Sequence, residues 1–235
     1  MTRLLDDEAL EASPVAANCV MNRQRSLTGS NGYARELGLG AAAELTARAA
    51  GAARVRWLDL CCGSGKALVE AALLLGDRGL AQRAEIVGVD LVDHFVTGCV
   101  PPALRLVAAP VTRWDPGGAF DLVTCVHGLH YVGDKLSVLA RVASWLTSDG
   151  LFAANFDARS VRSPHGQAMV RQLAAEIRRQ GFSYDPARRR VSRRGRGQVS
   201  FPYRYLGADD RAGPGYTGQP AVDSFYDSLR TSRER

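Results

Sequence analysis

A glycine-rich turn between a strand pattern and a helix pattern constrains this chain more than any other feature. Residues 55–60 form a short apolar strand pattern, Gly63 and Gly65 follow in a tight turn, and residues 66–75 have the apolar pattern of a helix. Glycine lets the backbone approach a ligand closely, and doubly wound α/β folds bind nucleotide-like ligands at such a junction. The sequence therefore predicts a cofactor site at this turn.

Two common nucleotide-binding motifs do not fit the turn. A P-loop needs a first glycine where this chain has Leu60, and a serine or threonine for magnesium where it has Ala67. A dinucleotide fingerprint needs a third glycine where this chain has Leu68, and Asp59 would place a carboxylate beside the pyrophosphate. ATP, NAD and FAD are therefore disfavoured as ligands.

The same segment resembles motif I of class I S-adenosylmethionine-dependent methyltransferases, in which a glycine-rich turn follows an acidic residue. Asp59, Gly63 and Gly65 match that motif, and Cys61 replaces its first glycine with another small residue. The resemblance implies S-adenosyl-L-methionine as cofactor and S-adenosyl-L-homocysteine as product. It also implies that Asp59 holds the ammonium group of the cofactor directly or through water, while backbone groups of the turn hold the rest.

The pattern beyond the turn predicts an α/β fold, a doubly wound and mostly parallel sheet. Further near-continuous apolar strand patterns alternate with helix patterns, at residues 85–90, 104–109, 121–126 and 150–156. Strands of this kind are typical of a parallel sheet covered on both faces. We expect an N-terminal helical lid over residues 1–50, a Rossmann-like domain over 51–206 and a loop-rich tail over 207–235.

Several boundaries of helices and strands can be predicted locally. Ser13 with Pro14 is a plausible helix start, and a helix over residues 33–50 should kink at its glycines 38 and 40. Asp134 is a good N-cap for a helix that runs to about residue 146. We also expect a helix over residues 164–180 and a strand over 198–205.

The second and third strand patterns carry the remaining cofactor candidates. Asp90 ends the second strand, where an acid normally accepts hydrogen bonds from a ribose diol, and Leu91 follows it. Many members of the family have an acidic residue after the third strand, facing the adenine amine. Here Ala109 falls near that place, so we expect backbone groups around Ala108 to Val111, or alternatively Thr112, to hold the adenine.

Two histidines follow the fourth strand pattern, in a run over residues 120–134 that resembles the family's fourth strand and the loop after it. In this fold that loop lies beside the transferred methyl group, which makes His127 and His130 the catalytic candidates. Histidine accepts a proton from a phenol, hydroxyl or amine near neutral pH. His127 is also a candidate for contact with the cofactor. There are two alternatives to a histidine base. His130 is a packing residue of the core, or the acceptor is an amine, which needs no strong base.

Four residues outside the motifs are candidates for contact with the acceptor. Arg23 and Tyr33 lie in the N-terminal segment, which closes over the cofactor as a lid in related enzymes. His165 precedes a predicted helix, and Tyr216 lies in the glycine- and proline-rich tail, where such loops can order over a substrate. Alternatively, the N-terminal residues form a solvated helix face, His165 is a surface residue, and the tail only wraps the surface.

The positive charge is concentrated in one segment. The chain has a net charge of +6, and in residues 171–196 nine arginines face only Glu176 and Asp185. Such a patch can attract nucleic acid, but the arginines from Arg188 to Arg196 lack the interleaved aromatic residues that stack on bases, apart from Tyr184 nearby. An Asn/Asp-Pro-Pro-Tyr-like motif of base-methylating enzymes is absent, since residues 126–129 read Val-His-Gly-Leu. Arginine in place of lysine also fits the codon bias of a GC-rich genome.

Composition limits the remaining functional classes. The five cysteines form no CxxC pair, which disfavours a zinc site and a disulfide framework. No apolar run approaches the roughly 20 residues that span a bilayer, and Met1 to Glu11 has no apolar core of a signal peptide. We expect a cytoplasmic enzyme without metal or membrane contact.

The leading hypothesis is methyl transfer to O or N of a small molecule in bacterial secondary metabolism. The alternatives are an RNA methyltransferase that uses residues 171–196, and a protein that binds the cofactor without methylating anything.

Overall fold

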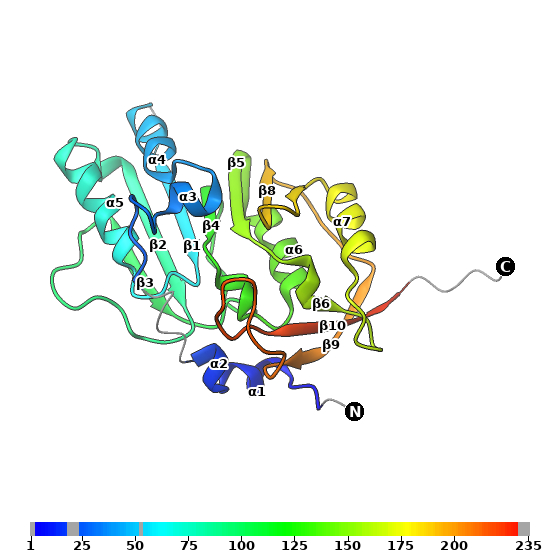
Figure 1. The fold of residues 1–235 in the computed structure, drawn as a ribbon. Helices are drawn as coiled ribbons and strands as arrows, with labels where there is room; N and C mark the ends of the chain where they lie inside the picture. Colours follow the sequence, from blue (N-terminus) through cyan, green and yellow to red (C-terminus); the bar gives the residue numbers. More distant parts are fainter. Residues whose placement is uncertain (1–2, 18–23, 52–53, 230–235) are drawn as a thin grey trace.

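A seven-stranded sheet lies at the centre of the computed structural model, which describes residues 3–17, 24–51 and 54–229 (Figure 1). The order across the sheet is β3-β2-β1-β4-β5-β8-β7. Its strands are β1 (Val55–Leu60), β2 (Ala84–Asp90), β3 (Leu104–Ala108), β4 (Phe120–Cys125), β5 (Leu146–Asn155), β7 (Ser183–Asp185) and β8 (Arg190–Arg194). Neighbours from β3 to β5 pair in parallel, and β8 is antiparallel to both of its neighbours. The predicted doubly wound, mostly parallel sheet is therefore confirmed.

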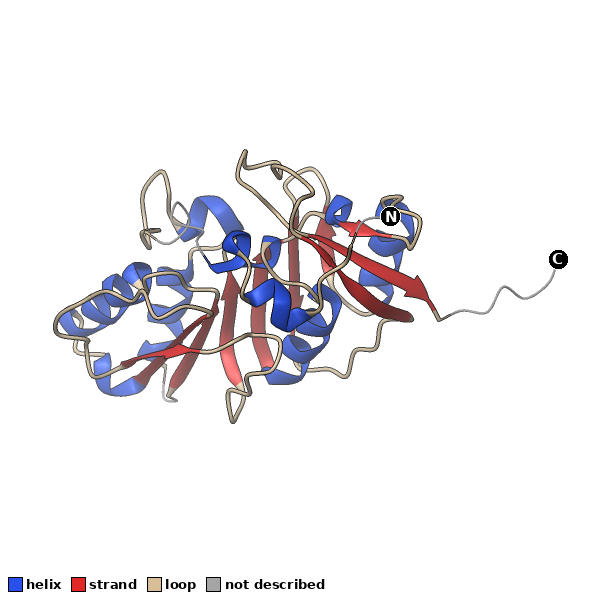
Figure 2. Cartoon of the chain, turned by 90° about the horizontal axis from the view of Figure 1, so that it is seen from below, coloured by secondary structure: helices blue, strands red, loops and turns tan. Residues whose placement is uncertain are grey.

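Helices cover both faces of this sheet (Figure 2). They are α1 (Asp7–Glu11), α2 (Pro14–Ala17), α3 (Tyr33–Leu37), α4 (Ala41–Ala50), α5 (Lys66–Asp77), α6 (Lys135–Trp145) and α7 (Val170–Arg179), with 3-10 turns η1 (Ala81–Arg83), η2 (Gly128–His130) and η3 (Ala158–Ser160). Residues of α3, α4 and α5 pack on one face of the sheet, and residues of α6 and α7 pack on the other.

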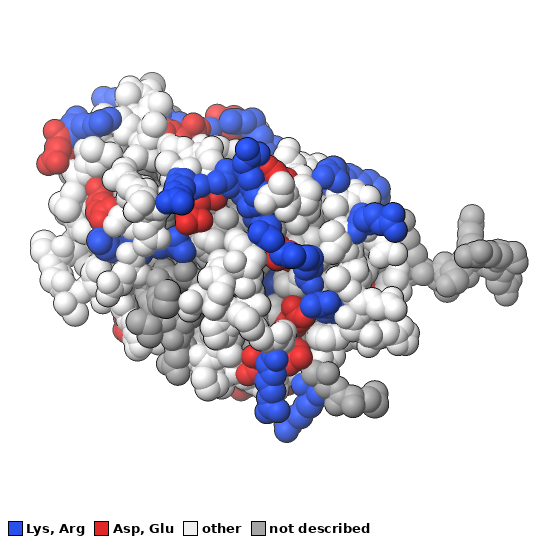
Figure 3. All heavy atoms as spheres, viewed as in Figure 1, with Lys and Arg blue, Asp and Glu red and all other residues white. Residues whose placement is uncertain are grey.

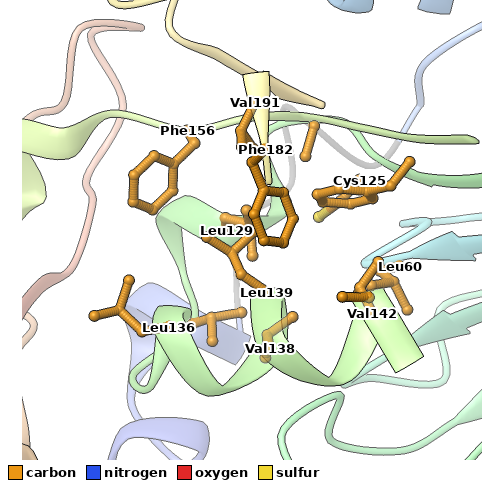
Figure 4. Packing of buried hydrophobic residues seen from close by; sticks show 14 of the residues in the cluster. Leu60, Cys125, Leu129, Leu136, Val138, Leu139, Val142, Phe156, Phe182 and Val191 are labelled. Carbon is orange, nitrogen blue, oxygen red and sulfur yellow. The ribbon is translucent and has the colours of Figure 1, made fainter. Parts of the chain in front are cut away.

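The alternation of side chains along β1 explains why its sequence reads as one apolar run. Successive residues of a strand point to opposite faces. Trp57 belongs to the core under α4 and α5, whereas Leu58 and Leu60 belong to the core under α6 and α7. Figure 4 shows part of this second core, where Leu60 and Cys125 meet side chains of α6. Because both faces are buried, most positions of the strand carry apolar side chains. Arg56 is the partly exposed exception and pairs with Glu85.

A second, three-stranded sheet corrects our expectation for the C-terminal segment. It consists of β6 (Val161–Arg162), β10 (Asp223–Ser228) and β9 (Tyr203–Asp209), in that order. The strand expected over residues 198–205 begins at residue 203, and a further strand lies within the tail that we expected to be loop-rich. In β10, Ser224 and Tyr226 are buried while their neighbours are not. This period of two is the signal that the many glycines and prolines before it obscured.

Helix boundaries follow the local signals with one exception. The helix expected over residues 33–50 is broken as predicted, because α3 ends at Gly38 (φ +67°) and α4 begins after Gly40. The Asp134 carboxylate caps α6 by accepting the N–H of Ser137 at 3.0 Å. The exception is α7, which begins at residue 170 instead of 164.

Within the part of the chain that the structure describes, no helix has the length and apolar character needed to cross a membrane.

Candidate active site

A cavity of about 740 Å³, its open mouth included, lies at the carboxyl ends of β1, β2 and β4. Seven of the nine cofactor candidates line it, namely Cys61, Gly63, Asp90, Leu91, Ala109, Val111 and His127. They come from four separate loops, and the parallel sheet brings these loops to one edge. Gly65 and Asp59 are buried and do not line the cavity.

The glycine turn has the conformation that its sequence requires. Gly63 and Gly65 have φ angles of +61° and +76°, in the region that glycine occupies without strain. A Cβ on Gly65 would also lie 2.8 Å from the Leu106 side chain. Asp90 stabilises the turn because its Oδ2 accepts the N–H of Gly63 at 2.8 Å. The acid at the end of β2 therefore positions the turn as well as lining the cavity.

Cys61 replaces a motif glycine in a left-handed backbone conformation, with φ +54°. Its side chain fits because residue 128 has none. A Cβ on Gly128 would lie 2.3 Å from Cβ of Cys61 and 2.7 Å from its Sγ. Cys61 and Gly128 therefore share one space, and a side chain at either position excludes one at the other.

Asp59 lies beneath the cavity in a closed hydrogen-bond network. Tyr33 Oη donates to Asp59 Oδ2 at 2.6 Å, and Thr124 Oγ1 donates to Oδ1. Thr124 in turn accepts the indole N–H of Trp57 at 2.8 Å. Burial raises the pKa of Asp59 to about 7. The structure thus places the predicted ammonium ligand and the predicted acceptor contact Tyr33 together in the core, away from the cavity surface.

His127 lies on the cavity wall, and its ring nitrogens contact three side chains. Its Nε2 is 2.8 Å from Glu36 Oε2, and its Nδ1 is 3.2 Å from Tyr216 Oη and 3.3 Å from His130 Nε2. The hydrogen bond from His127 is the main cause that lowers the pKa of Glu36 to about 2. Asn155 also contributes, since its Oδ1 accepts the backbone N–H of His127 at 3.2 Å.

His127, Glu36, His130 and Tyr216 form one cluster of side chains. His130 and Tyr216 are the members that do not line the cavity. Tyr216 Oη is 3.4 Å from His130 Nε2. Both side chains line a second, open hollow, which Asp157 and Asp223 also border. Burial lowers the pKa of His130 to about 3 and raises that of Tyr216 to about 12. Both groups are therefore neutral at pH 7.

Backbone strain is concentrated at this site. Among the described residues, three that are not glycine have a positive φ: Cys61, His127 and Arg189. The first two line the cavity, and the guanidinium of Arg189 lies 4.2 Å from the ring centroid of Tyr216. Such conformations cost free energy and cluster at functional sites.

The two remaining acceptor candidates are not in this cluster. His165 borders a different hollow, between α7 and the three-stranded sheet. Arg23 lies outside the described residues.

Sequence reasoning missed several residues of the site. Glu36 has no motif around it, and its pairing with His127 spans 91 positions of the chain. Asp7 and Glu11 on α1 also line the cavity. Glu11 connects α1 to the loop after β3, because it accepts hydrogen bonds from Thr112 Oγ1 at 3.0 Å and from the Arg113 guanidinium at 2.7 Å. No local pattern predicts contacts across such distances in sequence.

Over the ranges that the structure describes, no group of three or more His, Cys, Asp and Glu side chains is placed to hold a metal ion.

The strand order, the single antiparallel strand and a cavity above β1 and β2 are the features of class I S-adenosylmethionine-dependent methyltransferases. A family described as a methyltransferase domain matches residues 33–189, about two thirds of the chain. The chain belongs to this methyltransferase family, which confirms the family predicted from the sequence.

Individual relatives match a smaller part of the chain. A 2-phytyl-1,4-naphtoquinone methyltransferase of Synechococcus elongatus is 31% identical over 118 residues, which are 46% of this chain and 48% of that protein. The chain thus spans about half the length of the curated relatives it matches. Two solved structures are also similar. CalS10, an amino pentose methyltransferase from Micromonospora echinaspora with bound S-adenosylmethionine, is 24% identical over 48% of each chain (TM-score 0.36). The plantazolicin methyltransferase BpumL with bound S-adenosylhomocysteine is 13% identical over 43% of this chain and 38% of the other (TM-score 0.37).

Proposed function

We propose that this protein transfers the methyl group of S-adenosylmethionine to an oxygen or nitrogen of a small molecule. The observation that carries the proposal is one cavity that joins the motif residues to a buried histidine held by a carboxylate. Cys61, Gly63, Asp90 and His127 all line this cavity. Glu36, which does not line it, contacts Nε2 of His127.

The residues around the cavity fit the proposed cofactor. Asp90 is the acceptor for the ribose hydroxyls, and the backbone of residues 109–111 borders the space for adenine. Asp7 and Glu11 on α1 face the same cavity and supply acids that the loop after β3 lacks. When bound, the cofactor supplies a methyl group that is already activated by a sulfonium, so the protein mainly has to position the acceptor.

Glu36 prepares His127 to accept a proton. An ionised carboxylate only accepts hydrogen bonds, so Nε2 of His127 carries the hydrogen that Glu36 receives. In a neutral imidazole the other nitrogen, Nδ1, then has a free lone pair. Glu36 also stabilises the positive charge that His127 gains when it takes the proton, as the carboxylate does beside the histidine of hydrolase triads.

The arginine-rich segment favours a small molecule over RNA as acceptor. Seven of its nine arginines contact protein groups, at positions 178, 179, 188, 189, 190, 193 and 194. Several hold the fold together: Arg190, for example, donates to the backbone oxygen of Glu36. Figure 3 shows a band of basic side chains across one face, with acidic side chains among them. Three of them, Arg179, Arg188 and Arg189, pair with carboxylates and so offer less free charge to a phosphate backbone.

Calorimetric titration with S-adenosylmethionine and S-adenosylhomocysteine tests the cofactor. Asp90→Ala should weaken binding at least tenfold, whereas Asp93→Ala, an exposed acid three residues later, should not. NAD and ATP serve as comparison ligands. A folded protein that binds neither adenosyl compound contradicts the proposal, and binding of NAD or ATP instead means that the turn serves another ligand.

Acceptor turnover is the second test. Transfer of a labelled methyl group to any member of a phenol, alcohol and amine panel separates an enzyme from a protein that only binds the cofactor. The place in bacterial secondary metabolism and the cytoplasmic location stay predictions.

A further inference from the structure

Asn155 connects the two residues that the proposed function pairs. It is the last residue of β5 and is 2% exposed. Its Oδ1 accepts the backbone N–H of His127 at 3.2 Å, and its Nδ2 donates to the backbone oxygen of Glu36 at 3.2 Å. One contact needs an acceptor and the other a donor, so a carboxylate, which has acceptors alone, satisfies only the first. A single amide thus fixes the backbone of Glu36 relative to that of His127.

The backbone at both ends of this connection needs such support. His127 has a φ angle of +57°, a left-handed conformation that costs free energy in a residue other than glycine. Glu36 lies in the last turn of α3, where carbonyl oxygens have no N–H partner within the helix. Contacts from other elements therefore hold both backbone segments in place.

Arg190 holds the C-terminal end of α3 from the neighbouring strand. It lies opposite Asn155 in the antiparallel register of β5 and β8. Its Nε donates to the backbone oxygen of Glu36 at 2.7 Å, and its Nη2 donates to that of Arg35. The planar guanidinium presents these donors in a fixed geometry, which the single ammonium of a lysine does not. Glu36 is thus held through the same oxygen by Asn155 and by Arg190.

Gly38 leaves the space that this guanidinium occupies. It ends α3 with a φ angle of +67°, and a Cβ at this position would collide with Nη1 of Arg190. The residue that ends the helix therefore also admits the side chain that caps it, although the two lie far apart in the sequence.

The carboxylate of Glu36 is held at both of its oxygens. Oε1 accepts a hydrogen bond from Nη1 of Arg25 at 3.1 Å, and Oε2 lies 2.8 Å from Nε2 of His127. An ionised carboxylate only accepts, so the hydrogen of the neutral imidazole lies on Nε2. With its backbone and its carboxylate both fixed, Glu36 favours one tautomer and one orientation of the His127 ring.

We propose that Asn155 and Arg190 are positioning residues that hold Glu36 against Nε2 of His127, so that Nδ1 is the nitrogen that accepts a proton. This inference rests on the proposed function. It gives Arg190, one of the nine arginines in residues 171–196, a role at the site in place of a contact with nucleic acid. Neither positioning residue lines the cavity, so each acts on the reaction only through Glu36 and His127.

Nitrogen-15 NMR of the imidazole rings tests the positioning without any methyl transfer. The wild type should show His127 as one tautomer, with a hydrogen on Nε2 that exchanges slowly with water. His127→Gln identifies this signal among those of the four histidines. Asn155→Asp retains the shape and the acceptor for His127 but, when ionised, cannot donate to Glu36. It should show both tautomers and about tenfold faster exchange of the Nε2 hydrogen, the factor that one lost hydrogen bond corresponds to.

Arg190→Gln should have the same effect, and it serves as the second variant if Asn155→Asp does not fold. Arg190→Lys retains the charge without the two-donor geometry and should behave like Arg190→Gln. Arg194→Gln is the matched control, because Arg194 lies on the same strand and donates to the backbone oxygen of Asp149 at the surface. A wild-type His127 signal in folded Asn155→Asp and Arg190→Gln, or an equal loss of that signal in the control, would overturn the inference.

Methyl transfer separates this inference from the proposed function. With an acceptor that the wild type methylates, Asn155→Asp and Arg190→Gln should lower kcat by about ten- to a hundredfold. Their affinity for S-adenosylhomocysteine should stay that of the wild type, because neither residue lines the cavity. An unchanged kcat in variants that have lost the single tautomer contradicts the inference. A wild type that binds no S-adenosylhomocysteine contradicts the proposed function, whatever the NMR signal of His127 shows.

Discussion

Replacing Gly128 by alanine tests whether Cys61 and Gly128 share one space in the site. A Cβ at residue 128 would lie 2.3 Å from Cβ of Cys61, an atom that is fixed to the backbone and cannot rotate away. Overpacking of this kind costs about 1–3 kcal/mol, and we expect about 3 kcal/mol here. With Cys61→Gly in the background, the nearest neighbour named above is removed and Cys125 Sγ, at 2.8 Å, becomes the nearest atom, so the cost of Gly128→Ala should fall to about 1 kcal/mol.

The single change Cys61→Gly should be close to neutral. It removes a left-handed conformation that costs a residue other than glycine roughly 1–2 kcal/mol. It also adds backbone freedom to the unfolded chain, about 0.5–1 kcal/mol, and it loses the packing of a small side chain. The double-mutant cycle should therefore show a coupling of about 2 kcal/mol between the two positions, in the range seen for residues in contact.

Urea unfolding followed by tryptophan fluorescence measures all four corners of this cycle. Gly76→Ala is the control, because Gly76 lies in α5 and a Cβ there meets no atom within 4 Å. That variant should be more stable by about 1 kcal/mol. If Gly128→Ala is as harmless as the control, or if the coupling is below about 0.5 kcal/mol, the shared space does not explain why residue 128 is glycine.

Three further variants test other parts of the site. Glu11→Ala should weaken S-adenosylhomocysteine binding by about fivefold or less, because the half-exposed ion pair with Arg113 contributes little; Glu8→Ala on the same helix is the calorimetric control. The pKa of Asp59 is raised by folding to about 7, so the folded chain holds the extra proton between about pH 4 and pH 7. The free energy of unfolding should fall with rising pH in this window, by at most about 4 kcal/mol, and urea midpoints of Asp59→Asn should not show this fall. Lys135→Met leaves the backbone oxygens of residues 132 and 222 without a donor; its melting temperature should fall, by an amount that corresponds to about 2 kcal/mol.

The parts of the fold that the sequence predicted are those with local causes. The strand patterns, the break at Gly38 and the cap at Asp134 each depend on residues that are neighbours in the chain. The motif turn is local as well, because Gly63 and Gly65 adopt conformations that few other residues tolerate. For this reason the sequence predicts seven of the residues that line the cavity.

The parts that could not be predicted depend on contacts between distant segments. The arginine-rich segment contains α7, β7 and β8, and its charges obscured the strand pattern of β8 because several of its arginines pack against the protein. Asp59 was expected at the cofactor, but Tyr33 and Thr124 enclose its carboxylate from two other elements. Neither outcome has a signal within a few residues of the position concerned.

The family match also covers only some of the segments that meet at the site. The family match covers residues 33–189, which include the turn, Asp90, Glu36 and His127. It leaves out α1 and the hairpin that carries Tyr216. His127 is thus positioned by Glu36 from inside the family core and contacted by Tyr216 from outside it. Because Tyr216 comes from a segment outside the matched range, relatives with a similar cofactor cavity need not share the contact on Nδ1 of His127, and they need not methylate the same class of molecule.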